Sequence, residues 1–326
     1  MSFHSTRRAL LAGAGALLAT PARAAWPERP IRIIVPFAAG GNTDVMIRLL
    51  AEPMRARLGQ PIIVENRVGG GGALGAEAAA RSQPDGHTLF AGSGGTLSAN
   101  LVLQARLAYD AERDFSPIGL VARVPVALVV GARGRFRTLE DFFSAAREAP
   151  GNVTLATPGI GSTAHLALEL LMRASGVQLL HVPYRGGGSM VGDLLSGTFD
   201  ASLLEMSTAL PLHQDNRARV LAVAAEARSP HLPDIPTFIE RGVTGFTSTS
   251  FTALLAPART PEEIIAALRG ALLMALGDAN VRARIASLGA VTATEQEASP
   301  AGLAAFLAAE LAQSRRAAEI AGLRPQ

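Results

Sequence analysis

The chain has 326 residues and a mass of 33.7 kDa, which is enough for two domains. Hydrophobic residues make up 48% of it and charged residues 17%, which excludes a disordered chain. The sequence contains no Cys and no Lys, so it excludes disulfides, thiolate zinc sites, Walker phosphate loops and Schiff-base lysines.

The basic isoelectric point of 10.3 does not indicate nucleic-acid binding. All 30 basic residues are Arg, and three of them (Arg7, Arg8 and Arg23) lie in the first 24 residues. Without these three, 27 Arg balance 27 acidic residues. No basic run with interleaved aromatic residues is present, so we expect no nucleic-acid partner.

The N-terminal residues predict an export signal. Thr6-Arg7-Arg8 supplies positive charge, residues 9–19 are mildly apolar, and Ala22-Arg23-Ala24 is an A-x-A cleavage site. We expect a signal peptide over 1–24, cleaved near Ala24, and a periplasmic mature protein. The paired arginines favour the twin-arginine type, with an ordinary secretory signal as the alternative. The apolar stretch is shorter than the roughly 20 residues that span a bilayer.

The first predicted unit is a strand, a glycine turn and a helix. A β-branched apolar run over 31–35 is followed by Gly40-Gly41 and by a helical pattern that extends to Leu58. We expect Asn42 or Thr43 to cap this helix. The first amides of a helix have no partner within it, and together with the helix dipole they favour an anion. An ordinary strand-to-helix connection is the alternative.

Similar units recur along the chain and predict a doubly wound α/β architecture. Two extended segments around Pro125, within 115–130, are expected to form the first crossover to a second domain, and 247–256 should cross back. We expect domain 1 over 25–123 plus 249–326 and domain 2 over 124–248. Predicted strands cover 61–65, 88–91, 153–156, 178–182, 199–204 and 220–224, and predicted helices cover 73–81, 139–149, 163 onward, up to 196, 261–277, 279–288 and 300–321.

The opening pattern repeats at residues 157–165, where Gly161 and Ser162-Thr163 precede a helix with His165 in its first turn. Ser162 and His165 could suggest a hydrolase, but no Gly-x-Ser-x-Gly elbow surrounds Ser162 and no acid orients His165. We therefore expect Ser162 or Thr163 to cap the helix. Without a hydrolase motif, we expect no enzyme. The six His residues show no paired metal spacing, so we also expect no metal site.

The two glycine turns can face each other across a cleft if both sheets direct their strand ends towards the hinge. Amides and hydroxyls from 37–44 and 159–165 would then converge on one small anion. Without Lys and with few Arg nearby, a carboxylate fits better than a polyphosphate. Asp44 should turn back onto loop amides or hold an ordered water. The four glycines at 69–72 are only a weak match to a dinucleotide fingerprint, and we expect them to be structural or to form part of the rim of the site.

Several segments carry a family resemblance. They are Ile34-Val35-Pro36-Phe37-Ala38-Ala39-Gly40-Gly41, Val64-Glu65-Asn66-Arg67, Ser162-Thr163-Ala164-His165-Leu166 and His181-Val182-Pro183-Tyr184. With these the mature chain closely resembles the Bug (TctC-like) solute receptors of tripartite tricarboxylate transport systems. The resemblance implies a periplasmic binding protein type II-like fold, with two sheets flanked by helices and two crossover strands as the hinge. It further implies a monomer without cofactor that closes on a small carboxylate and engages permease subunits.

The chain departs from the family pattern at several positions. Asn42 replaces a small residue, and Arg185 stands where Lys is commoner. Gly187 and Gly188 replace bulkier small residues, and Glu205 takes the place of the acid in the usual Phe-Asp-Asn. These changes leave the ligand open among dicarboxylates, tricarboxylates, acidic amino acids and aromatic acids. A receptor for a sensor ectodomain, or an enzyme on this fold, is the alternative function. The predicted ligand-binding residues are Phe37, Ala38, Ala39, Gly40, Gly41, Asn42, Thr43, Asp44, Ser93, Gly94, Gly161, Ser162, Thr163, His165, Tyr184, Arg185 and Glu205.

Overall fold

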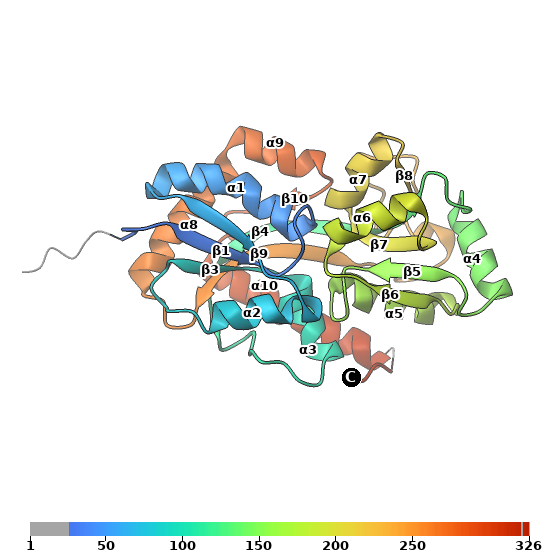
Figure 1. Cartoon of the computed structure of the whole chain (residues 1–326), viewed down its shortest axis with the longest axis horizontal. Helices are drawn as coiled ribbons and strands as arrows, with labels where there is room; N and C mark the ends of the chain where they lie inside the picture. The colour runs from blue at the N-terminus through green and yellow to red at the C-terminus, as the bar shows by residue number, and fades with distance from the viewer. Residues whose placement is uncertain (1–25, 321, 326) are drawn as a thin grey trace, which may run out of the picture.

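The computed structural model describes residues 26–320 and 322–325, so the predicted signal peptide lies outside the described residues. Ten strands of the described chain form a mixed sheet with two parts, which we call lobe 1 and lobe 2 together with the helices that cover them (Figure 1). Lobe 1 contains β1 (Ile31–Val35), β2 (Ile62–Asn66), β3 (Thr88–Ser93), β9 (Thr249–Pro257) and β10 (Val291–Thr292), lobe 2 contains β5 (Thr154–Thr157), β6 (Leu180–Pro183), β7 (Ala201–Glu205) and β8 (Ala218–Val223), and β4 (Phe115–Gly131) belongs to both.

The first strand, β1, lies at the centre of the parallel part of lobe 1. It pairs in parallel with β2 and with β3, so that Ile33 lies opposite both Val64 and Leu89. All its apolar side chains are fully buried, because helices cover both faces of the sheet. Its carboxyl end leads directly into the glycine turn.

The segments expected on both sides of Pro125 are extended and form the first crossover, but they are joined in one continuous strand, β4. Pro125 lies between Arg123, which pairs with β10, and Val126, which pairs with β7. The missing N–H of proline therefore falls where the strand changes neighbours, and the strand tolerates it there.

The return crossover lies beside this point. The amide of Val126 donates to the carbonyl of Ser248 at 2.9 Å, and the amide of Ser248 donates to Ala224 at 2.9 Å, both within lobe 2. The next residue, Thr249, pairs with Pro125 in lobe 1. Two neighbouring strands thus cross between the lobes, as expected for a hinge.

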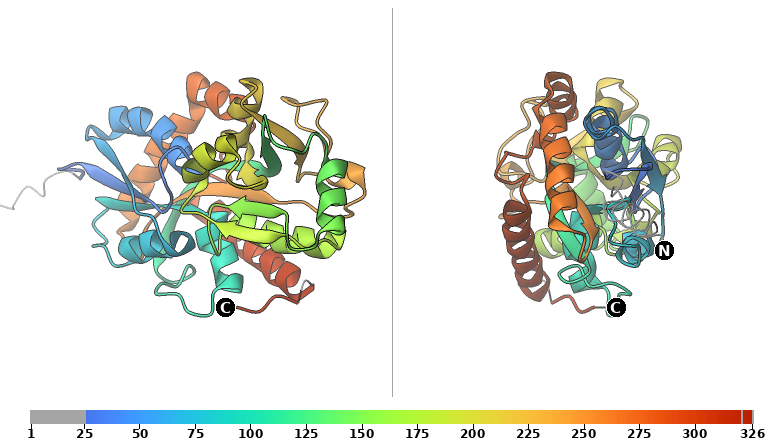
Figure 2. Two further views of the ribbon diagram at one scale, coloured as in Figure 1. Left: turned by 45° about the vertical axis from the view of Figure 1, so that its right-hand side comes forward. Right: turned by 90° about the vertical axis from the view of Figure 1, so that its left-hand side faces the viewer.

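Helices cover both faces of each lobe. In lobe 1, α1 and α8 pack together on one face, and α2 and α10 cover the other, with α10 running past α3 towards α5 (Figures 1 and 2). In lobe 2, α6 and α7 lie opposite α4 and α5. The helices are α1 (Asn42–Leu58), α2 (Ala73–Ala80), α3 (Asn100–Leu103), α4 (Leu139–Glu148), α5 (Thr163–Ser175), α6 (Gly187–Ser196), α7 (Met206–Gln214), α8 (Glu262–Gly277), α9 (Ala279–Ser287) and α10 (Pro300–Ile320), with short turns η1 (Gly70–Gly72), η2 (Gly95–Ala99) and η3 (Ile239–Arg241).

Helix caps show one error and one success of the sequence analysis. Neither Asn42 nor Thr43 caps α1: the helix already begins at Asn42, and Gly41 occupies the capping position without a side-chain hydrogen bond. The expected cap of α5 is confirmed, because Ser162 Oγ accepts from the His165 amide at 3.1 Å. The start of α1 therefore keeps its amides free of a capping side chain, which matters for the site below.

No single helix among the described residues is long and apolar enough to cross a membrane. By length and composition alone, α8 and α9 would pass as a pair that is bent by 70°.

Candidate functional site

A small cavity lies between the lobes, where both glycine turns end. Its volume is about 20 Å³, room for roughly one water molecule. Residues of both lobes line it, and none of these described residues is basic. They are Phe37, Gly41, Asn42, Thr43, Ser93, Gly95, Pro158, Ser162, Thr163, Gly187, Glu205 and Ser250.

The lobes are closed on each other around this cavity. The Ala38 amide of lobe 1 donates to the Arg185 carbonyl of lobe 2 at 3.1 Å. Ser207 Oγ at the start of α7 donates to Asn42 Oδ1 at 2.8 Å. These bonds join groups of different lobes, so they stabilise the closed arrangement only.

Glycines permit the close approach of the two chains. A Cβ built on Gly188 would overlap the carbonyl oxygen of Ala39 and would lie 3.1 Å from the Gly41 nitrogen. A Cβ on Gly95 would lie 3.2 Å from the Cα of Ser162. Since side chains at these two positions would hold the lobes apart, closure depends on their absence.

The N-termini of α1 and α5 meet at the cavity, one from each lobe. In the described chain, no hydrogen bond uses the backbone amides of Asn42, Thr43, Thr163 or Ala164. These amides open helices of 17 and 13 residues, whose dipoles favour negative charge at this end. The arrangement offers neutral N–H donors from two sides to one anion.

Two threonine hydroxyl groups of lobe 2 are unused in the described chain, and one of them, Thr163 Oγ1, belongs to a residue that lines the cavity. Thr163 Oγ1 and Thr208 Oγ1 are both buried without a hydrogen-bond partner. Buried hydroxyls are nearly always bonded, so the unpartnered Thr163 hydroxyl in the cavity lining points to a missing partner there. Ser162 Oγ, in contrast, is occupied as the cap of α5.

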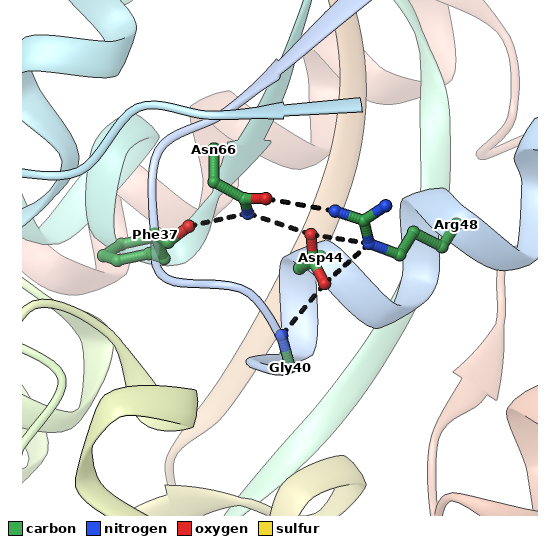
Figure 3. A network of polar contacts seen from close by, with 5 residues as sticks. All are labelled: Phe37, Gly40, Asp44, Arg48 and Asn66. Atoms are coloured by element: carbon green, nitrogen blue, oxygen red, sulfur yellow. Dashed lines mark hydrogen bonds and ion pairs between the residues drawn. The ribbon is translucent and has the colours of Figure 1, made fainter. Parts of the chain in front are cut away.

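The Asp44 carboxylate lies near the start of α1 but does not repel an anion in the cavity, because it is paired with Arg48 and bonded to Asn66 and Gly40 (Figure 3). Its carboxylate accepts from Arg48 Nε at 2.9 Å, from Asn66 Nδ2 at 2.9 Å and from the Gly40 amide at 2.9 Å. Although burial raises the pKa of Asp44, the hydrogen bonds from Arg48, Gly40 and Asn66 outweigh it and leave the pKa below its usual value. The carboxylate turns back onto the loop, as expected.

The same network positions the first glycine turn. Asn66 Nδ2 also donates to the Phe37 carbonyl at 2.9 Å, and Arg48 Nη2 donates to Asn66 Oδ1 at 3.1 Å. Phe37, which lines the cavity, is thereby tied through Asn66 to the end of β2. The side chains of Asp44, Arg48 and Asn66 therefore hold the turn on the side away from the cavity lining, which contains Phe37 and Gly41.

His165 and Gly161 support the second turn and lie outside the cavity lining. The Gly161 amide donates to His165 Nδ1 at 3.1 Å, so the imidazole is bonded to the turn and not to Ser162 Oγ. The ring stacks on His181 at 4.5 Å between centroids. Burial, and then the nearby His165, lower the pKa of His181 to about 4. His165 Nε2 lies 3.6 Å from Glu169 Oε1, so an acid does stand beside His165, contrary to the expectation from the sequence. Because the imidazole is not bonded to Ser162 Oγ, the two histidines pack as a stack that supports the turn.

Other predicted residues lie outside the cavity lining. Tyr184 donates its hydroxyl to Asp193 Oδ2 at 2.5 Å, and the Arg185 side chain is exposed while its carbonyl accepts from Ala38. A Cβ on Gly94 would meet Thr163 Oγ1 at 2.5 Å. The predicted residues outside the lining are Ala38, Ala39, Gly40, Asp44, Gly94, Gly161, His165, Tyr184 and Arg185.

Four lining residues were not predicted: Gly95, Pro158, Gly187 and Ser250. Gly95 and Pro158 belong to glycine turns that the sequence did mark. Gly187 follows Tyr184-Arg185 in a glycine run, which was a usable signal. Ser250 lies on the return crossover β9, and no motif marks it.

Within the described part of the chain, no three His, Asp or Glu side chains gather closely enough to hold a metal ion.

The sequence of this chain is similar to those of a known family of transporter receptors. A family model described as "Tripartite tricarboxylate transporter family receptor" matches residues 46–323. Protein BugT of Bordetella pertussis is 36% identical over 309 residues, which cover 93% of this chain and 94% of that protein.

Solved structures give the same picture. The periplasmic binding protein BugD matches with a TM-score of 0.88 and 33% identity, over 92% of this chain and 100% of that one. MatC from Rhodopseudomonas palustris with bound malate matches with a TM-score of 0.86 and 35% identity, over 90% of this chain and 99% of that one. The expected periplasmic binding protein-like α/β fold is thereby confirmed.

Proposed function

Because this chain belongs to the family of tripartite tricarboxylate transporter receptors, we propose that it captures a small carboxylate in the periplasm by closing its lobes. It then presents the closed form to a membrane permease. The family is one of solute-binding receptors and not of enzymes.

One observation carries this proposal: unbonded amides of two helix N-termini face one cavity from opposite lobes. An anion there gains hydrogen bonds from Asn42 or Thr43 on one side and from Thr163 or Ala164 on the other. With no basic side chain in the lining, a single carboxylate suits these neutral donors better than a polyphosphate. The malate bound to MatC, a carboxylate in a similar protein, supports this choice.

Closure follows from the same contacts. A ligand shifts an equilibrium towards the state that it binds better, and only the closed state brings both sets of amides to one carboxylate. The cavity of about 20 Å³ is too small for a whole organic acid. The acid therefore enters with the lobes apart and is held when they close.

Export and domain division are part of the proposal. The signal peptide over 1–24 delivers the mature chain to the periplasm. Domain 1, over 25–123 plus 249–326, and domain 2, over 124–248, rotate about the two neighbouring crossover strands. Determination of the N-terminal residue of the exported protein tests the first point: we expect Ala25.

A thermal-shift screen tests the carboxylate. The mature protein is heated with organic acids and, as matched controls, with their primary amides. A ligand at 100 times its dissociation constant should add about 2.7 kcal/mol to the free energy of unfolding. We expect acids to stabilise the protein and their amides to have no effect. Stabilisation by sugars or cations alone would overturn the proposal.

Uptake of the identified acid, radiolabelled, tests the permease. A strain that lacks this receptor should lose high-affinity uptake and regain it with the wild-type gene. Unchanged uptake together with a lost transcriptional response to the acid would instead identify a receptor for a sensor ectodomain.

A further inference from the structure

The cavity for the proposed carboxylate also contains a carboxylate of the protein. Glu205 ends β7, is partly buried, and lines the cavity together with Thr43 and Thr163. Unlike Asp44, which is paired with Arg48, Glu205 has no cationic partner in the described chain. Burial raises its pKa. A ligand made only of negative groups would place like charges together in a confined space, which is unfavourable.

A second group accompanies Glu205 at the same point. Thr208 Oγ1, one turn further along at the start of α7, is buried and has no hydrogen-bond partner in the described chain. A Cβ built on Gly187 would lie 3.7 Å from Glu205 Oε2 and 3.8 Å from Thr208 Oγ1. The Glu205 carboxylate and the Thr208 hydroxyl therefore border one spot, which is free of a side chain because residue 187 is glycine.

Charge and geometry together select the group that fits this spot. Glu205 Oε2 accepts hydrogen bonds, and Thr208 Oγ1 can accept one while its O–H donates to another group, so a partner with two or more donors can bond to both. A positive donor also neutralises the buried carboxylate, which otherwise carries an unpaired charge. An ammonium group meets both needs, since it has three N–H donors and one positive charge.

We propose that the ligand carries an ammonium group beside its carboxylate, and that Glu205 and Thr208 hold this group over Gly187. The ligand class is therefore an amino acid. This inference rests on the proposed function, because the helix N-termini of α1 and α5 hold the carboxylate of the same molecule. Glu205 thus makes the receptor selective for amino acids over carboxylic acids that lack an amine.

The test compares acids that differ only in the amine. Thermal shift is measured with the twenty common amino acids and with the carboxylic acid that corresponds to each without its amine, such as aspartate against succinate. The best pair is then titrated by calorimetry. We expect the amino acid to bind at least tenfold more tightly than its partner.

Three variants locate the effect. Glu205→Gln keeps the shape and removes the charge, so it should weaken binding of the amino acid at least tenfold and leave the acid without the amine unchanged or tighter. Gly187→Ala places a methyl group at the proposed subsite, with no contact below 3.4 Å, and should do the same. Gly192→Ala, in the same helix, has no atom within 4 Å of its new Cβ and should bind like wild type. Thermal melting of each variant alone shows that it is folded.

Each outcome has a separate meaning. If plain carboxylic acids bind as tightly as amino acids and Glu205→Gln affects both alike, the ammonium subsite is wrong while the carboxylate receptor stands. If plain dicarboxylic acids bind more tightly, Glu205 is protonated and donates to the second carboxylate, which also overturns the inference. If no acid of either kind binds, the proposed function itself fails.

Discussion

Closure of the lobes depends on a missing side chain at Gly188, and Gly188→Ala should prevent it. Gly188 lies in the first turn of α6, and its backbone is compatible with alanine because its φ is not in the left-handed region. The only obstacle is in the other lobe. The new Cβ would overlap the carbonyl oxygen of Ala39 and lie 3.1 Å from the carbonyl carbon of Ala39.

The size of the effect follows from these contacts. Ordinary van der Waals contact begins near 3.4 Å, so the lobes must stay roughly 1 Å further apart in the variant. This shift breaks the 3.1 Å bond between the Ala38 amide and the Arg185 carbonyl, a loss of about 1 kcal/mol. It also removes at least one charge-assisted bond to the carboxylate, about 2 kcal/mol. The sum of about 3 kcal/mol corresponds to roughly 100-fold weaker binding.

Calorimetric titration with the acid from the thermal-shift screen measures this loss. Gly192→Ala is the matched control, because it makes the same substitution in the same helix with no atom within 4 Å. Both variants gain helix propensity, by up to about 1 kcal/mol, so neither should melt below wild type without ligand.

The reasoning is refuted if Gly188→Ala binds the acid with wild-type affinity while it is folded. Equal losses in both glycine variants would refute it as well, since the effect would then come from α6 and not from the contact between the lobes.

Three further predictions concern single contacts. Asn42→Ala removes the acceptor of Ser207 Oγ between the lobes and should weaken ligand binding about fivefold, or about 1 kcal/mol, in calorimetry; unchanged affinity would contradict a role in closure. The pKa of Asp44 is lower in the folded protein than in the unfolded chain, where it is about 4. The ionised side chain therefore stabilises the folded protein above about pH 4, and this stabilisation is lost as the pH falls through the pKa of the folded state. Asp44→Asn should therefore flatten the decline of the melting temperature below about pH 4, and a decline as steep as in wild type would disprove the pairing with Arg48. Thr138→Ala removes the capping box of α4 and should cost about 1 kcal/mol of stability in denaturant unfolding without a change in affinity.

Local patterns predicted much of the fold because their causes are local. The β-branched run of β1, the cap of α5 by Ser162 and the inward turn of Asp44 all depend on residues within a few positions of each other. Helix α7 was missed for the same reason: it starts directly after β7 and contains Pro211, and both features argue locally against a helix.

The site was harder to predict where it depends on contacts between the lobes. Asn42 was expected to cap α1, but its side chain reaches Ser207, 165 positions away, and this attraction is invisible in the local pattern. Ser250 lines the cavity only because it lies on β9, the return crossover, which pairs with β4 between the lobes. Pro125 does not interrupt β4, because the strand that pairs with one edge of β4 changes there from β10 to β7. In each case the deciding partner is distant in sequence.

The most direct test of the central claim is a crystal structure of the mature protein with the acid that stabilises it most. We predict one carboxylate of the ligand within hydrogen-bond distance of backbone amides at the starts of both α1 and α5, from Asn42 or Thr43 and from Thr163 or Ala164. A carboxylate that contacts only one of these helices, or a ligand bound outside the space between the lobes, would contradict the account.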